Sequence, residues 1–562
     1  MREMLTAIEK IEAAPGQRIL VVSDIHGHFN HLVQLLRKME YGGDDILVIV
    51  GDLIEKGPES LRVVQYVMDL SRQHPVYVSM GNVDLGRLRM LRCDDPESGE
   101  SFAGFLKWSE EYWESCLFGE MLADMGIKIS QVDGQNAPEY RRRIREQFHE
   151  ELNFLWSRPT ILTAGRYLFV HGGVPTDDPD ALAGTEAHPY LKNDSFLDKG
   201  YGFERYTVVT GHWPVSLYRS DREDMGPLFE RERNILCIDG GCGLKQTGQL
   251  NGVIIPDCMA GMEEICWESY DDFPEVTALD DREAAPLSFH VQYFDNRVEL
   301  LEEKGKNGII RHLSSGKVFE APLKWLYPGE TGLQCTDLCD GRLAVSAGDR
   351  LKLVFETEDG LYVKKQGQLG WYDGRVKPED AKPCLTAGAP SGENWRRERE
   401  VAVYGLLERL GISFDRIDHR EANTMEACRA IDEALEAVIC KNLFLCNQQR
   451  TRFYLLLMPE GKKFRTKDLS KQIDSSRLSF GEPVYLERFL RLTPGSVSVM
   501  GLMNDTKNQV QLLIDREVLK EGGLFGCHPC MNTSSIRLSL PDLLEKFLPA
   551  VHHEPMFVDL PS

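Results

Sequence analysis

The chain has 562 residues, 42% of them hydrophobic and 27% charged, and its net charge is −23. This length exceeds what one hydrophobic core supports and predicts three or four domains. No apolar run reaches the about 18 residues that a membrane-spanning helix needs, and residues 1–24 lack the features of a signal peptide, so we expect no membrane partner. The 14 cysteines lack disulfide-scaffold spacing and predict reduced thiols in a cytoplasmic protein.

The acidic excess lies within residues 1–393, because Lys and Arg balance Asp and Glu from residue 394 to residue 562. The acidic charge of residues 1–393 argues against non-specific nucleic-acid binding there, and we expect no DNA partner. Residues 394–562 have no net charge and carry four cationic side chains within residues 462–467, which either contact a polyanion or form a solvated loop.

Four short apolar runs end in polar or Gly-containing residues, as buried strands do when they lead into a site. They are residues 18–24, 45–52, 75–82 and 167–173. Residues 29–40 and 59–73, which lie between the first three runs, have helical spacing. Alternating strands and helices predict an α/β sheet with its ligands on the loops. We assign residues 1–285 to this domain, and residues 88–158 to an inserted helical cap.

The rest of the chain reads as three further parts. Residues 286–376 alternate apolar and polar residues around Gly-Asp and Asp-Gly turns, which predicts a small all-β barrel. Residues 377–393 have the Pro, Gly, Ser and Ala content of a linker. A new helical pattern then opens a separate domain over residues 394–562. The predicted fold class is therefore multidomain α/β.

Five polar blocks in the first domain carry the candidate chemistry. They read DIHGH at 24–28, GDLIEKG at 51–57, GNVD at 81–84, HGG at 171–173 and GH at 211–212. Asp and His one residue apart can point two ligands at one cation, and a second Asp can bridge to a neighbouring ion. Such a mixed oxygen and nitrogen set suits Mn²⁺, Fe or Zn²⁺ better than Ca²⁺. Two ions at about 3.5–4 Å would activate water and clamp an in-line displacement.

These blocks resemble the calcineurin-like metallophosphoesterases, particularly the serine/threonine-phosphatase and diadenosine-tetraphosphatase branch, over about residues 18–255. The resemblance implies a four-layer α/β sandwich and a site for two divalent ions, with Mn²⁺ expected first and Fe or Zn²⁺ as alternatives. It implies that Asp24 and His26 bind one metal, that Asp52 bridges, and that Asn82, His171 and His212 bind the other. In the DGG block at Asp239–Gly241, the resemblance implies a packing role.

Two positions depart from the pattern of this branch. Val83 stands where the catalytic His of a GNH block protonates the leaving oxygen, and Glu55 and Lys56 stand where an Asp-Arg pair is usual. Lys56 can neutralise a phosphate, but only as a point charge. General acid catalysis is worth about 10²–10⁴-fold, so we expect slow hydrolysis of alkyl phosphates and a preference for good leaving groups. Asp84, His28 or a cap residue could supply the proton instead.

The last domain shows polar blocks but no metal pattern. Lys441 lies between two apolar stretches, so we expect a buried stem and an ammonium that faces a cleft; the alternative is an ordinary surface lysine. Cys527 and Cys530 form a CxxC spacing, but no second Cys pair or βαβ context supports a zinc or redox site.

Together the blocks KNLF, RLTPGSVS…GLMND and HP…NT resemble the YbaK/ProX-like aminoacyl-tRNA editing domains. The resemblance implies hydrolysis of a mischarged aminoacyl ester of the Ala- or Cys-tRNA(Pro) class, with the tRNA acceptor end as partner and no metal. It implies that Lys441 contacts the terminal nucleotide, that the loop starting at Gly495 donates N–H groups to the ester carbonyl, and that His528 lines the amino-acid pocket. Further substrate contacts are implied for Asn442, Thr424 and Asn532. Val499 replaces a proline that is common in this loop.

Within residues 286–376, the stretch GLYVKKQGQLGWYDGRV resembles bacterial SH3-like modules, although a structural spacer explains it equally well. We therefore predict a hydrolase with two activities: cleavage of a phosphate ester or anhydride, with a nucleotide as the expected substrate, and aminoacyl-tRNA deacylation. The alternative is a regulatory protein that binds metal, nucleotide and aminoacyl-tRNA with little turnover at the Val83 site.

Overall fold

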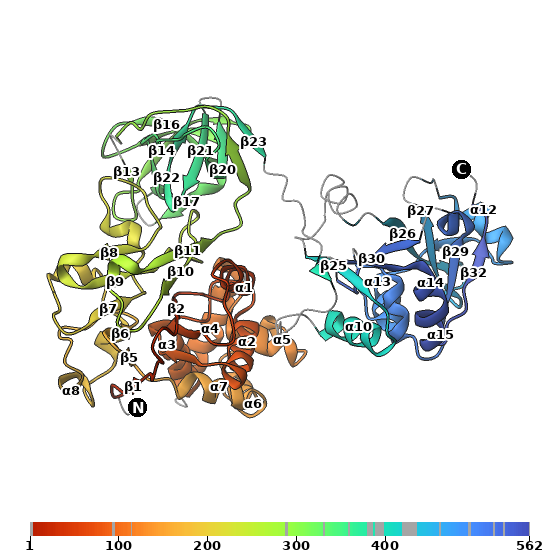
Figure 1. Ribbon diagram of the computed structural model, residues 1–562, viewed down its shortest axis with the longest axis horizontal. Coiled ribbons are helices and arrows are strands. Elements are labelled where there is room, and N and C mark those ends of the chain that lie inside the picture. The colour runs from red at the N-terminus through yellow and green to blue at the C-terminus, as the bar shows by residue number, and fades with distance from the viewer. Residues whose placement is uncertain are drawn as a thin grey trace. The chain divides into compact units, whose positions relative to one another are not determined.

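The computed structural model of the chain describes residues 4–92, 96–113, 115–286, 290–329, 332–357, 360–378, 386–387, 398–418, 435, 437–459, 462, 464–492, 496–520, 523–531 and 534–560. The chain divides into two compact units, Met1–Glu379 and Asp380–Ser562. Figure 1 shows helices and strands in both units. Each is a mixed α/β or β-rich assembly, so the chain is a multidomain α/β protein.

Two sheets form the centre of the first unit. One has the order β11 (Cys266–Tyr270), β10 (Leu250–Ile255), β2 (Ile19–Val22), β3 (Ile46–Val50) and β4 (Val76–Ser79). The other has the order β1 (Ile8–Lys10), β5 (Ile161–Ala164), β6 (Tyr167–Val170), β7 (Thr207–Thr210), β9 (Ile235–Cys237) and β8 (Leu228–Glu230). Strands β2, β3 and β4 run parallel, as do β6, β7 and β9, so their carboxyl ends gather at one edge of each sheet.

The two sheets pack face to face through alternate side chains of their buried strands. Val21 and Val48 of one sheet share a core with Phe169 and Leu236 of the other. Helices α1 (Phe29–Lys38) and α2 (Ser60–Gln73) pack against the first sheet, and both present an apolar face. Shorter helices, including α8 (Pro179–Leu182) and α9 (His188–Leu191), lie around a second core beside β6 and β7. The inner strands are buried on both faces, as a sandwich of this kind requires; they are β2, β3, β5, β6, β7 and β9.

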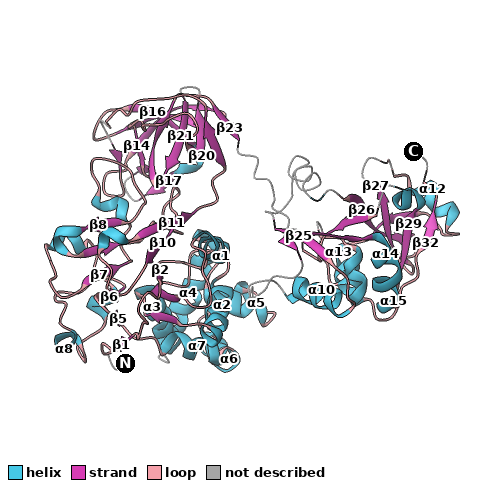
Figure 2. Cartoon of the chain, in the orientation of Figure 1, coloured by secondary structure: helices cyan, strands magenta, loops and turns pink. Residues whose placement is uncertain are grey.

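A group of helices follows β4 before the chain returns to the second sheet (Figure 2). It comprises α3 (Asn82–Arg92), α4 (Pro96–Tyr112), α5 (Leu117–Asp124), α6 (Ala137–Gln147) and α7 (His149–Trp156). Glu120 of α5 accepts hydrogen bonds from the backbone N–H groups of Ser60 and Leu61 at 2.8 and 2.7 Å. Its carboxylate therefore caps the N-terminus of α2 and ties the helical group to the sandwich.

The remainder of the first unit is a β-rich segment. Its main sheet has the order β22 (Gln368–Tyr372), β21 (Gly360–Lys365), β20 (Arg350–Thr357), β12 (Glu275–Ala278) and β23 (Val376–Pro378). A second sheet contains β14 (Val298–Lys304), β15 (Asn307–His312) and β16 (Val318–Pro322). Two separate two-stranded sheets complete the segment: β13 (His290–Val291) with β19 (Leu338–Cys339), and β17 (Leu326–Gly329) with β18 (Gly332–Cys335). Strand β12 precedes residue 286 and yet pairs with β20, a pairing that local patterns did not reveal. The SH3-like resemblance stays a prediction.

Buried polar contacts join this segment to the sandwich. Tyr362 of β21 donates a hydrogen bond to Glu223 at 2.5 Å, and Lys364 pairs with Asp271 at 2.7 Å. Both acids are buried, and burial raises the pKa of Glu223 to about 7. Because these charges and hydroxyls satisfy one another inside the fold, the β-rich segment is packed against the sandwich rather than suspended from it.

In the second unit one sheet has the order β24 (Thr386–Ala387), β25 (Phe414–Asp418), β31 (Ser534–Ser539), β30 (Leu524–Cys527), β26 (Val438–Asn447), β27 (Phe453–Pro459), β29 (Val510–Asp515) and β32 (Met556–Val558), with β28 (Leu478–Phe480) also on β26. Its helices include α10 (Glu398–Arg409), α12 (Thr466–Gln472) and α13 (Pro483–Leu490). Across the described ranges of both units, no helix combines the length and apolarity needed to cross a membrane.

Candidate functional site

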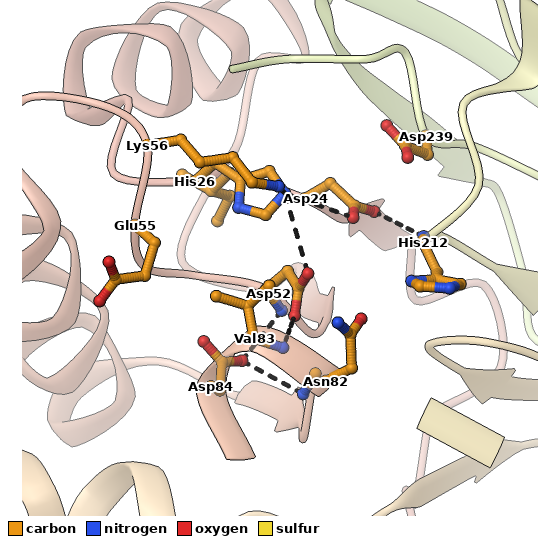
Figure 3. Close-up of polar contacts among 12 residues, drawn as sticks. Asp24, His26, Asp52, Glu55, Lys56, Asn82, Val83, Asp84, His212 and Asp239 are labelled. Atoms are coloured by element: carbon orange, nitrogen blue, oxygen red, sulfur yellow. Dashed lines mark hydrogen bonds and ion pairs between the residues drawn. The ribbon is translucent and has the colours of Figure 1, made fainter. Parts of the chain in front are cut away.

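The polar blocks of the first unit converge at the carboxyl ends of its central strands. Asp24 and His26 follow β2, Asp52 follows β3, Asn82 follows β4, and His171 and His212 follow β6 and β7. Figure 3 shows Asp24, Asp52 and Asn82 close together, with His26 and His212 on either side. All six residues proposed as ligands from the sequence therefore lie at one site.

The donor atoms of this site are within reach of common cations. Nε2 of His171 lies 3.4 Å from Oδ2 of Asp52 and 3.0 Å from Oδ1 of Asn82. Nε2 of His26 lies 3.8 Å from a carboxylate oxygen of Asp24 and 3.8 Å from one of Asp52. Donor atoms of Asp24, Asp52 and His171 all lie within 4.8 Å of one another. Asp52 contacts both histidines, as a bridging ligand would.

The backbone at these residues is held in an unusual conformation. Asp24, His26, Asp52 and His212 have φ angles of 52°, 48°, 52° and 69°, in the left-handed region that non-glycine residues seldom adopt. Such strain persists only where the surrounding structure enforces it, and it is typical of functional sites. Neighbouring glycines permit the close packing, because a Cβ at Gly81 would collide with Oδ1 of Asp52. The loops are shaped to bring these side chains together.

The donor set fits divalent cations. Buried carboxylates without a partner are unstable, and Oδ1 of Asp24 is buried without a hydrogen bond in the described part of the chain. Burial raises the pKa of Asp24 to about 6. Burial opposes the charged form of His171, but the carboxylates of Asp52 and Asp24 outweigh it and raise its pKa to about 10. The buried carboxylates are thus balanced by protons, a role that a divalent cation would take over.

The remaining nitrogens of the histidines are oriented by hydrogen bonds. Nδ1 of His171 lies 2.8 Å from the carbonyl of Val50, and Nδ1 of His26 lies 3.2 Å from the carbonyl of Ile54. Nε2 of His212 lies 2.7 Å from a carboxylate oxygen of Asp194, which leaves its Nδ1 as the nitrogen that a cation could use. Partners of this kind fix the tautomer and ring orientation of metal-binding histidines.

Two acidic groups beside the site have structural partners. The carboxylate of Asp84 accepts hydrogen bonds from the backbone N–H groups of Asp52, Leu53 and Gly81 at 2.9, 3.1 and 3.1 Å. It organises the two metal-facing loops and has little capacity left to act as the proton donor. In Figure 3, Glu55 and His212 lie on opposite sides of Asp52. Its carboxylate lies 3.5 Å from the guanidinium of Arg87, toward the helical group.

Aromatic side chains lie beside His212, one of the proposed ligands. Trp213 directly follows His212, and its ring stacks on that of Phe294 at a centroid distance of 6.3 Å and an interplanar angle of 26°. Phe294 also contacts Tyr293 edge to face at 5.2 Å. Phe294 is 71% exposed and Tyr293 is 62% exposed, an unusual state for large apolar rings. The β-rich segment thus supplies exposed aromatic surface beside a metal-facing loop.

The second unit places part of its predicted site on two neighbouring parallel strands. Ile439 of β26 pairs with Gly526 of β30, so Lys441 and His528, each two residues further on, come to the same level. Lys441 is exposed, and the expectation of a buried stem is wrong, because the inward positions of β26 are filled by its apolar neighbours. Oδ1 of Asn442 is buried without a hydrogen-bond partner in the described residues.

The loop before Val499 and the residue His528 are in direct contact. The hydroxyl of Ser498 donates to the carbonyl of His528 at 2.5 Å, and Nδ1 of His528 lies 2.9 Å from the carbonyl of Ser534. Burial lowers the pKa of His528 and favours its neutral form. Val499 is fully buried in the core. Thr424, Gly495 and Asn532 lie outside the described residues.

Comparison with known proteins identifies both regions. Residues 17–239 match the calcineurin-like phosphoesterase family, and residues 419–546 match the aminoacyl-tRNA editing domain. The prolyl-tRNA editing protein ProX of Acetoanaerobium sticklandii is 33% identical over 153 residues, which are 27% of this chain and 92% of that protein. Through its C-terminal domain the chain belongs to the aminoacyl-tRNA editing family, and residues 17–239 form a calcineurin-like phosphoesterase domain.

Other similarities to the phosphoesterase domain are shorter or weaker. The symmetrical bis(5'-nucleosyl)-tetraphosphatase of Buchnera aphidicola is 39% identical over 70 residues, which are 12% of this chain and only 24% of that protein. A protein serine/threonine phosphatase structure from Saccharomyces cerevisiae aligns at 16% identity with a TM-score of 0.29, over 50% of this chain and 86% of that one. The chain therefore spans about a quarter of this tetraphosphatase.

Lys56 stands where the serine/threonine-phosphatase and diadenosine-tetraphosphatase pattern has an arginine. The Nζ atom of Lys56 lies 2.8 Å from Nε2 of His26, on the nitrogen that would face a metal. Burial first, and then the charge of Lys56, lower the pKa of His26 to about 3. The sequence predicted a lysine that contacts phosphate; the structure places its ammonium against a predicted ligand.

Two acids were missed or given a different role by sequence reasoning. Asp194 lies in a loop without periodicity, and no local signal links it to His212. Asp239 was assigned to packing, but its carboxylate lies on the Asp24 side of the phosphoesterase site in Figure 3, and one oxygen is buried without a partner among the described residues. Its position at the end of β9, after the pattern that also precedes Asp24 and Asp52, was the available signal.

Proposed function

We propose that Asp24, His26, Asp52, Asn82, His171 and His212 hold two divalent ions, Mn²⁺ being expected first and Fe or Zn²⁺ second, and that this centre hydrolyses nucleotide-derived phosphate esters or anhydrides. The observation that carries the proposal is the contact of Asp52 with both His26 and His171, because a carboxylate between two imidazoles suits a bridging ligand. Bound divalent ions would supply an activated water and neutralise charge on the phosphate.

The residues of the chain divide the remaining work. Asp194 keeps His212 oriented, and Asp84 holds the loops of Asp52 and Gly81 in register through their N–H groups. Lys56, once it leaves His26, can place its ammonium on a phosphate oxygen. Val83 has no proton to donate, and the Asp84 carboxylate is occupied by backbone N–H groups, so we expect the leaving oxygen to depart unprotonated or to take its proton from water. This favours phosphoanhydrides and aryl esters over alkyl phosphates.

The aromatic rings beside His212 support a nucleotide as the substrate. A nucleobase stacked on Trp213 or Phe294 would gain about 1–3 kcal/mol, whatever its identity. The ring of Phe294 contacts Trp213 and Tyr293 and is largely exposed. A phosphoprotein substrate would not need this surface. Robust turnover of phosphoproteins together with none of nucleotides would overturn the proposed substrate class.

For the editing domain we propose deacylation of a mischarged tRNA of the Ala- or Cys-tRNA(Pro) class, with the acceptor end at Lys441. Support comes from the shared level of Lys441 and His528 on adjacent strands and from the contact of Ser498 with His528. An exposed lysine is available to a nucleotide phosphate. Gly495, Thr424 and Asn532 complete the proposed pocket and stay predictions from the sequence.

A paired experiment tests the two activities in one chain. Lys441→Ala should slow release of alanine from Ala-tRNA(Pro) and leave hydrolysis of bis-p-nitrophenyl phosphate unchanged. Asp52→Asn should slow hydrolysis of bis-p-nitrophenyl phosphate and leave release of alanine unchanged. Lys441→Arg is the matched control, because it keeps the positive charge at an exposed position. Equal loss of both activities in either variant would contradict separate sites.

A further inference from the structure

A second group of metal-binding side chains lies in the phosphoesterase domain, apart from the six residues of the proposed catalytic centre. His28, His31 and Cys242 each offer one donor atom, and these atoms all lie within 4.8 Å of one another. Two imidazole nitrogens and a sulfur form a donor set different from the carboxylate-rich one around Asp52. Among first-row cations this set favours Zn²⁺.

Local structure explains why these three residues meet. His28 is the N-cap residue of α1 and His31 lies three positions later, so both rings point from the same face of the first turn. Their ring centroids are 4.9 Å apart. Cys242 approaches from the loop after β9, where Gly243 has a φ of 71° and a Cβ would lie 2.9 Å from Nε2 of His28. Glycine at 243 therefore allows the cysteine loop to close on the helix.

Two donors of this cluster, those of His28 and Cys242, have no hydrogen bond of ordinary length among the described residues. Nε2 of His28 is buried and has no partner within the described ranges, which is costly for a polar nitrogen. The sulfur of Cys242 is buried, and its contact with the carbonyl of Ile25 is long, at 3.9 Å. A carboxylate oxygen of Asp272 lies 3.7 Å from Nε2 of His31. Asp272 is exposed and can approach as a fourth ligand or orient His31.

We propose that His28, His31 and Cys242, with Asp272 or a water in the fourth position, bind a structural Zn²⁺ ion. On binding, the Cys242 thiol loses its proton to solvent and the sulfur–metal bond forms, while both imidazoles bind as neutral ligands. Burial raises the pKa of the Cys242 thiol, so the group stays protonated until a cation enters. No electron transfer is involved.

Such an ion would join three segments that shape the catalytic loop. It would tie the start of α1 to the loop after β9 and to the turn that follows β11. Asp24 and His26 lie directly before His28, so the ion would restrain the backbone on which both proposed catalytic ligands sit. Its role is positional, and it would not touch substrate.

Cobalt spectroscopy on the chelator-treated full-length protein tests the proposal. Co²⁺ bound to a thiolate shows a near-ultraviolet charge-transfer band, whereas Co²⁺ at the carboxylate and histidine centre does not. We expect the band in the wild type and in Asp52→Ala. We expect Cys242→Ser to lose the band and to bind one metal equivalent fewer. Asp272→Asn should lower the affinity of the site for Co²⁺ about tenfold, because the His31 ring would no longer be oriented by a carboxylate.

Control variants separate this site from other thiols and from misfolding. Cys266 is exposed, and Cys266→Ser should keep the band. Cys527→Ser, which removes one thiol of the CxxC spacing in the editing domain, should keep the band as well. His31→Asn removes a ligand without touching a thiol and should also lose the band, while far-ultraviolet circular dichroism reports the fold. Absence of the band in the wild type, or its persistence in Cys242→Ser, would overturn the proposal.

Discussion

The ammonium of Lys56 lies 2.8 Å from Nε2 of His26, a histidine that the family pattern assigns to a metal. Burial lowers the pKa of Lys56, and the nearby carboxylates of Asp52 and Asp24 counteract that effect. Lys56 itself has a φ of 73°, which turns its side chain toward His26. A cation bound by His26 must therefore displace this ammonium, and metal binding and Lys56 are coupled.

Lys56→Met should bind Mn²⁺ more tightly than the wild type, because a competing charge leaves the site. We expect about a tenfold gain, or about 1.4 kcal/mol, in titrations followed by calorimetry. The same variant should raise KM for phosphate esters, since no cation remains to meet the phosphate. Lys56→Arg is the control that keeps the charge. Weaker Mn²⁺ binding by Lys56→Met would contradict the competition.

Val83→His should restore a proton donor next to Asn82. General acid catalysis helps poor leaving groups most, so hydrolysis of phenyl phosphate should rise by about tenfold or more while that of p-nitrophenyl phosphate changes little. The ratio of the two rates is the measurement. Val83→Ala serves as a control for side-chain removal. A uniform rise for both esters would mean that the histidine acts on binding and not on the leaving group.

The order of the metal-facing residues followed from strand patterns, because buried apolar runs that end in Asp or His place those side chains at one sheet edge. The direction of Lys56 did not follow, since it depends on a left-handed backbone that residue identity does not reveal. The partner of His212 was also missed, because Asp194 meets it through a loop contact 18 residues away in the chain.

Phe294→Ala should weaken the binding of nucleotide substrates and leave that of simple phosphate esters unchanged. Loss of one stacking surface is worth about 1–3 kcal/mol, so we expect KM for a dinucleoside polyphosphate to rise about 5- to 100-fold. Hydrolysis of bis-p-nitrophenyl phosphate should stay within about twofold, and stability should not change, because the ring is 71% exposed. Phe480→Ala, in the editing domain and 63% exposed, is the matched control. Equal effects on both substrates would argue against base stacking.

Glu223 should make the stability of the first unit depend on pH. Burial raises its pKa from 4.5 to about 7, so the native state holds a proton that the unfolded state releases. The retained proton contributes to the free energy of unfolding below pH 4.5. That contribution is lost as the pH rises through about 7, which lowers the free energy of unfolding by about 3 kcal/mol. Glu223→Gln should remove this slope from the thermal unfolding curves measured between pH 4.5 and 8. An unchanged slope in Glu223→Gln would contradict the assignment.

The editing domain shows the limits of local patterns in another way. The apolar stretches around Lys441 suggested a buried stem, but strand alternation leaves Lys441 on the exposed face of β26. Lys441 and His528 come to the same level through parallel pairing between strands almost 90 residues apart, which a family motif can imply and a local pattern cannot.

The proposed hydrolysis depends on a working two-metal centre organised by Asp52. We would measure metal content by elemental analysis after loading with Mn²⁺, together with turnover of bis-p-nitrophenyl phosphate in wild type and Asp52→Asn. We expect about two Mn²⁺ ions per chain, and turnover that falls about a hundredfold or more in Asp52→Asn together with loss of metal. Full metal loading without turnover in the wild type, or full turnover in Asp52→Asn, would contradict it.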